Sequence, residues 1–223
     1  MVAANGTFDC DRARSLSPVH LSLLQSTHRQ SDQQVSPMHT RAHDSTTTPL
    51  PARIVLAGFM GAGKSTVGRL LAARLGWDFV DLDDAIVQAE GQEIATLFAA
   101  LGETVFRKRE HAALKRILPQ SSLVLALGGG ALESEANRKL LRDTPNTRIV
   151  FLEAPLATLL ARCQQQQTQP NAAIRPVLAN LENLSQRYMD RLPHYQAAHH
   201  TVSTKNREPD EVVNAVLKTM QFP

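Results

Sequence analysis

The segment from Gly58 to Ser65, with the sequence GFMGAGKS, carries the clearest chemical signal in the chain. It fits the G-x-x-x-x-G-K-[ST] pattern of phosphate-binding loops. Gly58 and Gly63 allow the tight turn that aims successive backbone N–H groups at a phosphate. Lys64 can reach the β and γ phosphates of a nucleotide, and the Ser65 hydroxyl can bind Mg²⁺. The segment therefore predicts a nucleotide-binding loop, and the alternative is a glycine-rich turn that binds nothing.

The residues on both sides of this loop predict the elements that it needs. Residues 53–57 (RIVLA) form a short apolar run, as expected of a buried strand. Residues 66–75 have apolar side chains at helical spacing, and Gly76 can end that helix. The order strand, loop, helix places a helix N-terminus at the phosphate site, where its positive potential stabilises an anion.

Two carboxylates follow the second predicted strand, residues 77–81. Asp81 and Asp83 point to the same side if the segment is extended, and neighbouring carboxylates repel unless a cation or a donor lies between them. Mg²⁺ bound through water to one carboxylate, and a substrate hydroxyl on the other, would relieve this repulsion. The alternative is an acidic first turn that only stabilises the next helix, which is the role we expect for Asp84.

Glycines and arginines form the remaining candidate groups. Gly128-Gly129-Gly130 follows the third predicted strand, where it forms either a backbone surface for a ligand or an ordinary strand-to-helix turn. A guanidinium can hold a carboxylate or a phosphate by two parallel hydrogen bonds. Spacing alone does not distinguish Arg107, Arg175 and Arg191 from the arginines expected to face solvent.

The chain from residue 52 onward alternates strand-like and helix-like segments. This order predicts an α/β fold with a parallel sheet covered by helices on both faces, and ligands beyond the carboxyl ends of the strands. We expect Ser134 to cap one helix and Pro193 to end another. Strands are expected over 53–57, 77–81, 123–127, 147–152 and 200–204, and helices over 66–75, 82–90, 93–101, 103–118, 134–142, 155–163, 181–192 and 210–220.

Length and composition predict one folded domain, residues 52–223, after an N-terminal extension. Residues 1–51 are rich in Ser and Thr and have little apolar periodicity, so we expect them to be disordered. A transit peptide and a mis-assigned start codon are the alternatives for this segment.

Charge and cysteine usage limit the partners and the compartment. The net charge of +3, without a compact block of Lys and Arg, favours a small anionic ligand over nucleic acid. Cys10 and Cys163 are the two cysteines, which fits a reducing compartment, and no apolar run approaches the length of a membrane span. We therefore expect a cytoplasmic protein that binds neither nucleic acid nor membrane.

From about Arg53 to its C-terminus the chain resembles the shikimate kinases. The P-loop alone marks a broad superfamily, whereas the full set of motifs in this order is much narrower. The segments that carry the resemblance are 58–66, 79–83 (FVDLD), 106–107 (FR), 128–130 (GGG), 175–178 (RPVL) and 191–195 (RLPHY).

The resemblance implies a P-loop NTPase fold of three layers, like that of nucleoside monophosphate kinases, with a mobile lid over residues 163–179. It implies a monomer that transfers phosphate from MgATP to the 3-hydroxyl of shikimate. By the same resemblance, ATP would be bound by Gly61, Ala62, Gly63, Lys64, Ser65, Thr66, Arg162, Arg175 and Arg207.

The resemblance also implies a role for each remaining candidate. Lys64, Asp83 and Arg175 would be catalytic, with Asp83 hydrogen-bonded to the acceptor hydroxyl. Shikimate would be bound by Asp83, Arg107, Gly128, Gly129, Gly130 and Arg191, and its carboxylate would lie between the two arginines. Mg²⁺ would bind Ser65 directly and Asp81 through water, and Glu110 would orient Arg107.

Three other functions remain open at this point. A gluconate-type or other small-metabolite kinase would share the P-loop and an arginine clamp. A nucleoside monophosphate kinase is disfavoured by the triple glycine and by the context of Arg191. A non-catalytic ligand sensor on the same fold is disfavoured because Lys64, Asp83 and Arg175 are all present.

Overall fold

The computed structural model describes residues 50–167 and 181–222 of the chain. These residues belong to one compact unit, Thr46–Pro223. The expected extension up to residue 49 and most of the expected lid, residues 168–179, lie outside the described residues, as does Arg175.

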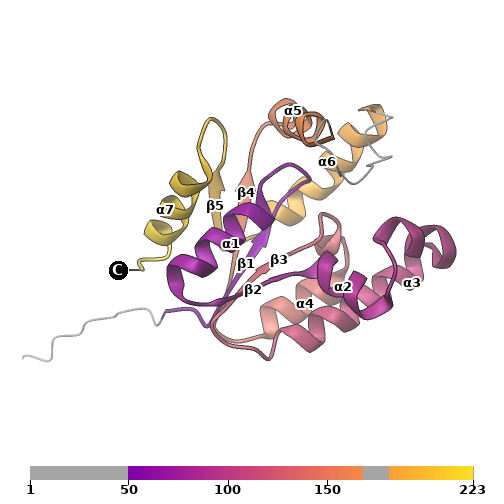
Figure 1. Ribbon diagram of the computed structural model, residues 1–223, viewed down its shortest axis with the longest axis horizontal. Helices are drawn as coiled ribbons and strands as arrows, with labels where there is room; N and C mark the ends of the chain where they lie inside the picture. Colours follow the sequence, from indigo (N-terminus) through magenta and orange to yellow (C-terminus); the bar gives the residue numbers. More distant parts are fainter. Residues whose placement is uncertain (1–49, 168–180, 223) are drawn as a thin grey trace, which may run out of the picture. The chain divides into compact units, whose positions relative to one another are not determined.

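A parallel sheet forms the centre of this unit, as the alternating pattern predicts (Figure 1). The strand order is β2-β3-β1-β4-β5, so β1 lies between β3 and β4. Residue Ile54 of β1 is in register with Val124 of β3 and with Arg148 of β4. The strands are β1 (Arg53–Ala57), β2 (Asp78–Asp81), β3 (Leu123–Ala126), β4 (Thr147–Glu153) and β5 (His200–Ser203).

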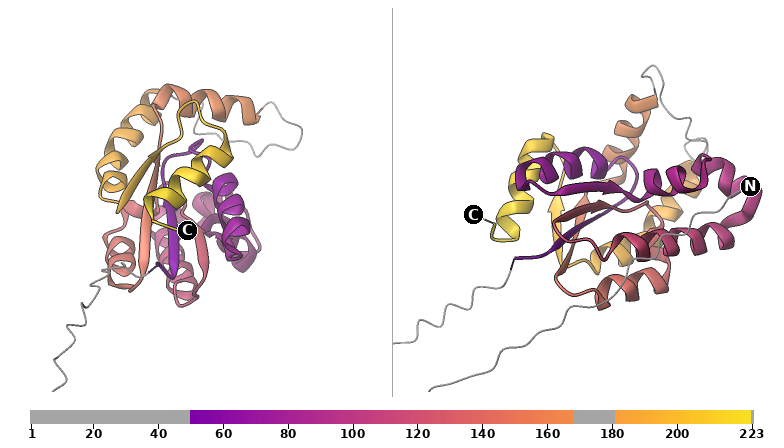
Figure 2. Two further views of the ribbon diagram at one scale, coloured as in Figure 1. Left: turned by 90° about the vertical axis from the view of Figure 1, so that its left-hand side faces the viewer. Right: turned by 60° about the horizontal axis from the view of Figure 1, so that its bottom comes forward.

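Helices cover both faces of the sheet, which confirms the expected three layers (Figures 1 and 2). All residues of β1 and β3 are buried, because both strands lie inside the sheet with helices on each side. The helices are α1 (Lys64–Leu75), α2 (Leu82–Glu90), α3 (Ile94–Ile117), α4 (Glu135–Asp143), α5 (Leu156–Gln167), α6 (Leu181–Gln196) and α7 (Pro209–Thr219), with a short 3-10 helix, η1 (Ala131–Glu133).

Helix ends follow the local signals closely. Gly76 has left-handed dihedral angles and ends α1, and Ser134 caps α4 by accepting a hydrogen bond from the Asn137 backbone N–H. Helix α3 spans both helices expected over 93–118, but Gly102 interrupts it with φ 74° and ψ 166°. The backbone is non-helical at Gly102, so the two predicted helices are confirmed as two helical segments of α3 that meet at a kink.

The prediction that Pro193 ends its helix is wrong. Helix α6 continues through Pro193 to Gln196. A proline lacks only its own N–H donor, and the next turn is closed by the Ala197 N–H, which donates to the Pro193 carbonyl at 3.2 Å. Tyr195 is buried in this last turn and stacks on Phe151 of β4, with ring centroids 5.3 Å apart. This packing stabilises the turn that the proline weakens.

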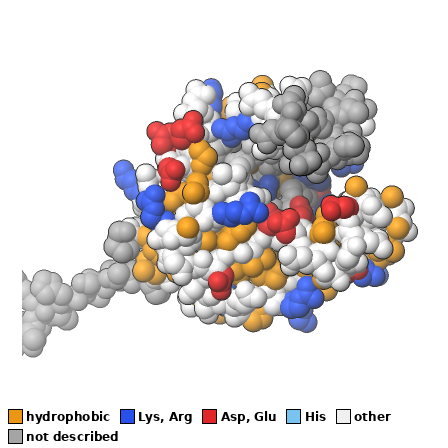
Figure 3. All heavy atoms as spheres, viewed as in Figure 1, with side chains coloured by type: hydrophobic (Ala, Val, Ile, Leu, Met, Phe, Trp, Pro, Cys, Tyr) orange, Lys and Arg blue, Asp and Glu red, His pale blue; other side chains and the backbone are white. Residues whose placement is uncertain are grey.

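On the face seen in Figure 3, acidic and basic side chains are interspersed and do not gather by sign. Within residues 50–167 and 181–222, the structure contains no helix that is both long and apolar enough to cross a membrane.

Candidate active site

The P-loop connects β1 to α1 at the carboxyl edge of the sheet. Gly58 has φ 146°, and a Cβ at this position would lie 2.7 Å from the Leu152 carbonyl oxygen of β4. Gly61 has φ 76°, and a Cβ there would lie 2.6 Å from the Leu159 carbonyl oxygen of α5. Side chains are therefore excluded at both positions, and the loop passes close to β4 and α5.

Lys64 is the first residue of α1, and its side chain lies over the loop. Its Nζ donates to the carbonyl oxygens of Gly58 at 2.9 Å and Phe59 at 3.1 Å. This contact holds the ammonium group at the N-terminus of α1, the place that the sequence pattern predicts for it.

Ser65 and Asp81 are brought together although they are far apart in the sequence. The Ser65 hydroxyl lies 2.6 Å from Asp81 Oδ2. The other oxygen of Asp81 accepts the Asp83 backbone N–H at 3.1 Å, so Asp81 is the N-cap of α2. Helix α2 begins at Leu82, as expected, so Asp83 lies in its first turn and the same-side alternation of an extended segment does not apply to Asp81 and Asp83. Asp84 lies in the first turn of α2, as expected, and the N-cap itself is Asp81.

The donors for a metal ion at this place are few. Among the described residues, no group of three or more His, Cys, Asp or Glu could hold a metal ion. One hydroxyl and one carboxylate fit Mg²⁺, which keeps several waters and takes further oxygens from substrate phosphates.

Asp83 lies beside Gly128 because β2 and β3 are neighbours in the sheet. Asp81 is in register with Ala126, and each segment advances two residues past this pair to reach Asp83 and Gly128. Burial raises the pKa of the Asp83 carboxyl group, and the nearby Asp81 carboxylate raises it further, while Lys64 opposes the shift. Asp83 is therefore a stronger proton acceptor than an ordinary aspartate.

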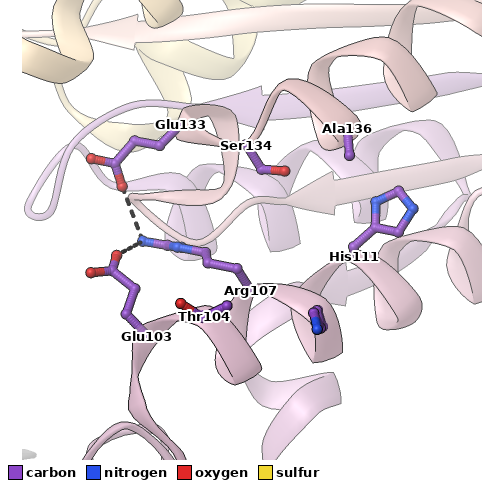
Figure 4. Close-up of a pocket in the computed structure, with 8 residues that line it drawn as sticks. Glu103, Thr104, Arg107, His111, Glu133, Ser134 and Ala136 are labelled. Atoms are coloured by element: carbon purple, nitrogen blue, oxygen red, sulfur yellow. Dashed lines mark hydrogen bonds and ion pairs between the residues drawn. The ribbon is translucent and has the colours of Figure 1, made fainter.

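Arg107 from α3 and Arg191 from α6 converge on one carboxylate, that of Glu133 on η1. Arg107 Nη2 lies 3.0 Å from Glu133 Oε2, and Arg191 donates to the same carboxylate from Nε at 3.1 Å and Nη2 at 3.2 Å. Figure 4 shows Glu133 and Glu103 pointing at the Arg107 guanidinium from two sides, at a cavity of about 710 Å³. The pair of arginines expected to bind one carboxylate thus already holds one.

A buried polar network fixes Arg107 from behind. Its Nη1 donates to both oxygens of Glu110, at 3.0 and 3.1 Å, and the Glu110 side chain is 1% exposed. Glu110 also accepts a hydrogen bond from Asn137 at 3.3 Å, and Asn137 donates to the Ala131 carbonyl at 2.9 Å. Burial raises the pKa of the Glu110 carboxyl group, and the nearby Arg107 guanidinium partly offsets this rise. The contact expected between Glu110 and Arg107 is present.

The three consecutive glycines each face one of the expected substrate-binding side chains. A Cβ at Gly128 would lie 2.5 Å from Asp83 Oδ1, and one at Gly129 would lie 3.5 Å from Arg191 Nη1. A Cβ at Gly130 would collide with Arg107 Nη2. The glycines therefore leave the space in which these side chains meet.

Two residues of this site are absent from the sequence-based predictions. The Tyr195 hydroxyl donates to the Gly129 carbonyl at 2.5 Å and fixes the glycine segment to α6, and burial raises the pKa of this hydroxyl. Tyr195 is part of the RLPHY segment, so its position was available as a signal. Glu133 follows the triple glycine by three residues, and no pattern in the sequence marks it.

Arg162 and Arg207 form hydrogen bonds with neighbouring residues at the end of β5. Arg162 donates to the Thr204 hydroxyl at 3.0 Å and to the Thr204 carbonyl at 2.6 Å. Arg207 donates to the Ser203 carbonyl at 3.1 Å. Arg162 lies on α5, the helix that also touches the P-loop at Gly61.

Comparison with known proteins gives the family. The family model described as "Shikimate kinase" matches residues 60–221. The chain belongs to the shikimate kinase family. A curated shikimate kinase from Salinibacter ruber is 40% identical over 183 residues, which cover 77% of this chain and 86% of that protein.

Solved structures agree with this family. A shikimate kinase from Acinetobacter baumannii, solved in complex with shikimate, is 34% identical with a TM-score of 0.65, and the match covers 77% of this chain and 93% of that one. A gluconokinase from Sinorhizobium meliloti is only 19% identical with a TM-score of 0.52, over 77% of this chain and 93% of that one, so it shares the fold alone. The chain is thus a family member with the P-loop kinase fold that its motifs predict.

Proposed function

We propose that the protein transfers the γ-phosphoryl group of ATP to the 3-hydroxyl of shikimate, which yields shikimate 3-phosphate and ADP for aromatic amino acid biosynthesis. One observation carries this proposal: the triple glycine gathers Asp83, Arg107 and Arg191 beside the P-loop. A ligand with hydroxyls and one carboxylate matches this set of one acceptor and two cations.

ATP binds through its phosphates on the P-loop in this proposal. The backbone N–H groups from Gly61 to Thr66 and the Lys64 ammonium group surround the β and γ phosphates. Arg162 and Arg207 flank the adenine, because both lie at the segment after β5. Arg175, which lies outside the described residues, contacts the ATP phosphates in this proposal.

Ser65 and Asp81 are the proposed magnesium site. Their contact at 2.6 Å places a hydroxyl and a carboxylate next to the P-loop lysine, and the Asp81 carboxylate binds Mg²⁺ through water. When bound, Mg²⁺ offsets the negative charge of the β and γ phosphates.

Shikimate lies with its carboxylate on Arg107 and Arg191 and its ring hydroxyls at Asp83. The Gly129 N–H gives the carboxylate a further donor. Because Arg107 and Arg191 come from α3 and α6, the acceptor is held by two separate elements of the fold. This fixes its 3-hydroxyl in line with the γ-phosphoryl group, which is most of what phosphoryl transfer requires.

Asp83 orients the 3-hydroxyl and takes its proton. The hydroxyl oxygen bonds to the γ-phosphorus as the bond from that phosphorus to the bridging oxygen of ADP breaks, and the proton moves to the Asp83 carboxylate. Burial and Asp81 raise the pKa of this carboxylate, which strengthens it as a proton acceptor. Lys64 stabilises the negative charge on the transferring group.

A monomer in the cytoplasm is the proposed state of the protein. Large hydrophobic side chains exposed among the described residues are scattered over the segment before β1, α1, α3 and α6. Light scattering after gel filtration measures the mass, and a dimer would contradict the proposal.

Acceptor selectivity tests the function. ADP release from MgATP is measured with shikimate, gluconate, a nucleoside monophosphate or no acceptor. We expect shikimate alone to stimulate release strongly. Stimulation by another acceptor instead would support kinase activity but contradict shikimate as the substrate. ATP binding without stimulation by any acceptor would favour a ligand sensor.

A further inference from the structure

Glu133 occupies the position that a substrate carboxylate needs. Its two oxygens receive the Nε and Nη2 donors of Arg191 at 3.1 and 3.2 Å, which is the paired edge that a guanidinium offers to a carboxylate. The same carboxylate accepts a hydrogen bond from Arg107 Nη2 at 3.0 Å. A second carboxylate cannot use these donors while Glu133 holds them.

Glu133 differs from Glu110, the other carboxylate on Arg107. The Glu110 side chain is 1% exposed and Asn137 holds it from behind, so it has no route to solvent. The Glu133 side chain is 34% exposed and lies at the cavity of Figure 4. Within the described part of the chain, its carboxylate forms ion pairs with Arg107 and Arg191. Glu133 is therefore the carboxylate that can leave.

We propose that Glu133 is an internal competitor for the acceptor carboxylate and thereby a specificity-determining residue. It neutralises Arg107 and Arg191 when no acceptor is bound, and it moves toward solvent when the carboxylate of shikimate takes the paired edge of Arg191. An acceptor without a carboxylate does not displace Glu133, so both arginines stay paired with it and do not bind neutral molecules. This inference rests on the proposed function.

The substitution Glu133→Gln tests the inference because it keeps the shape and removes the charge. Initial rates are measured against shikimate at saturating MgATP, and shikimate affinity is measured separately by calorimetry. We expect the shikimate KM and Kd to fall about five-fold, with kcat unchanged, because loss of one partly exposed ion pair has an effect of this size. If Glu133 instead positioned the arginines, both constants would rise.

Glu135→Gln is the matched control. Glu135 lies two residues away and pairs with Arg138 and Arg142, outside the substrate site. The KM of the Glu135→Gln variant for shikimate is expected to equal that of the wild type. Glu133→Asp is a second variant, whose shorter side chain reaches both arginines less well, and its KM is also expected to fall. Thermal melting of each variant identifies any that does not fold.

The outcomes separate this inference from the function on which it rests. A wild-type protein that does not phosphorylate shikimate contradicts the proposed function. A wild-type protein that does so, with an unchanged or raised KM in folded Glu133→Gln and Glu133→Asp, contradicts the role of Glu133 alone.

Discussion

Asp83 lies against Gly128 so closely that a Cβ at residue 128 would stand 2.5 Å from Asp83 Oδ1. The contact arises because β2 and β3 are adjacent and in register at Asp81 and Ala126. Each residue follows its strand by two positions, so the sheet itself fixes their approach. The glycine is needed here to leave room for the Asp83 carboxylate.

Gly128→Ala should displace Asp83 and lower kcat by at least about 10-fold, since a misplaced proton acceptor loses most of its contribution to the rate. ATP affinity should not change. Gly129→Ala is the matched comparison, because a Cβ at residue 129 would lie at an ordinary distance of 3.5 Å from Arg191 Nη1. Its kcat should therefore fall less than that of Gly128→Ala. Equal effects of the two substitutions on kcat would contradict a specific role for the Gly128–Asp83 contact.

Lys64→Ala should lower kcat by about 100-fold or more, the usual effect of losing a donor that stabilises charge in the transition state. Steady-state ADP release with shikimate measures this loss. Lys139→Ala is the control, because Lys139 lies on the exposed surface of α4 and pairs with Asp143. Retention of a tenth of wild-type activity by Lys64→Ala would remove the lysine from the proposed mechanism.

Arg107→Ala should mainly raise the KM for shikimate, by about 100-fold, because a charge-assisted pair with the substrate is lost and the buried Glu110 loses its cationic partner. The KM for ATP should stay near its wild-type value. Arg109→Ala is a suitable control, since Arg109 is more exposed and pairs with Glu90. A normal shikimate KM in Arg107→Ala would end the carboxylate-clamp interpretation.

Asp83→Asn should lower kcat and yet raise thermal stability at neutral pH. The pKa of Asp83 is raised in the folded state, so Asp83 opposes folding increasingly as the pH rises from its unfolded-state pKa to that raised pKa, and fully above it. Asparagine removes this penalty. The stability difference should disappear below about pH 3, where Asp83 is protonated in both the folded and the unfolded states. A variant that is less stable than the wild type at pH 8 would contradict the direction of the shift.

Local signals predicted much of the fold. β1 has the expected bounds, Arg53–Ala57, and Gly76 and Ser134 end and begin helices as expected. The pattern did not predict that α6 passes through Pro193, because tertiary packing of Tyr195 outweighs the local preference of proline.

The sequence predicted the site residues that belong to motifs. It did not predict contacts that depend on how separate elements pack together. Lys64 lies over the loop as the P-loop pattern predicts, and the resemblance paired Ser65 with Asp81 and selected Arg107 and Arg191. The Glu133 contact depends on how η1 lies between α3 and α6, which no local pattern in the sequence specifies. Arg175 belongs to residues outside those described, so its role stays a prediction.

Phosphorus NMR of the reaction mixture tests the central claim most directly. Purified protein is incubated with MgATP and shikimate, and the spectrum is followed over time. The proposed function predicts a new phosphomonoester resonance, coupled to the proton on carbon 3 of shikimate, that grows in step with ADP. ADP accompanied only by inorganic phosphate, or a phosphoester at another carbon, would contradict it.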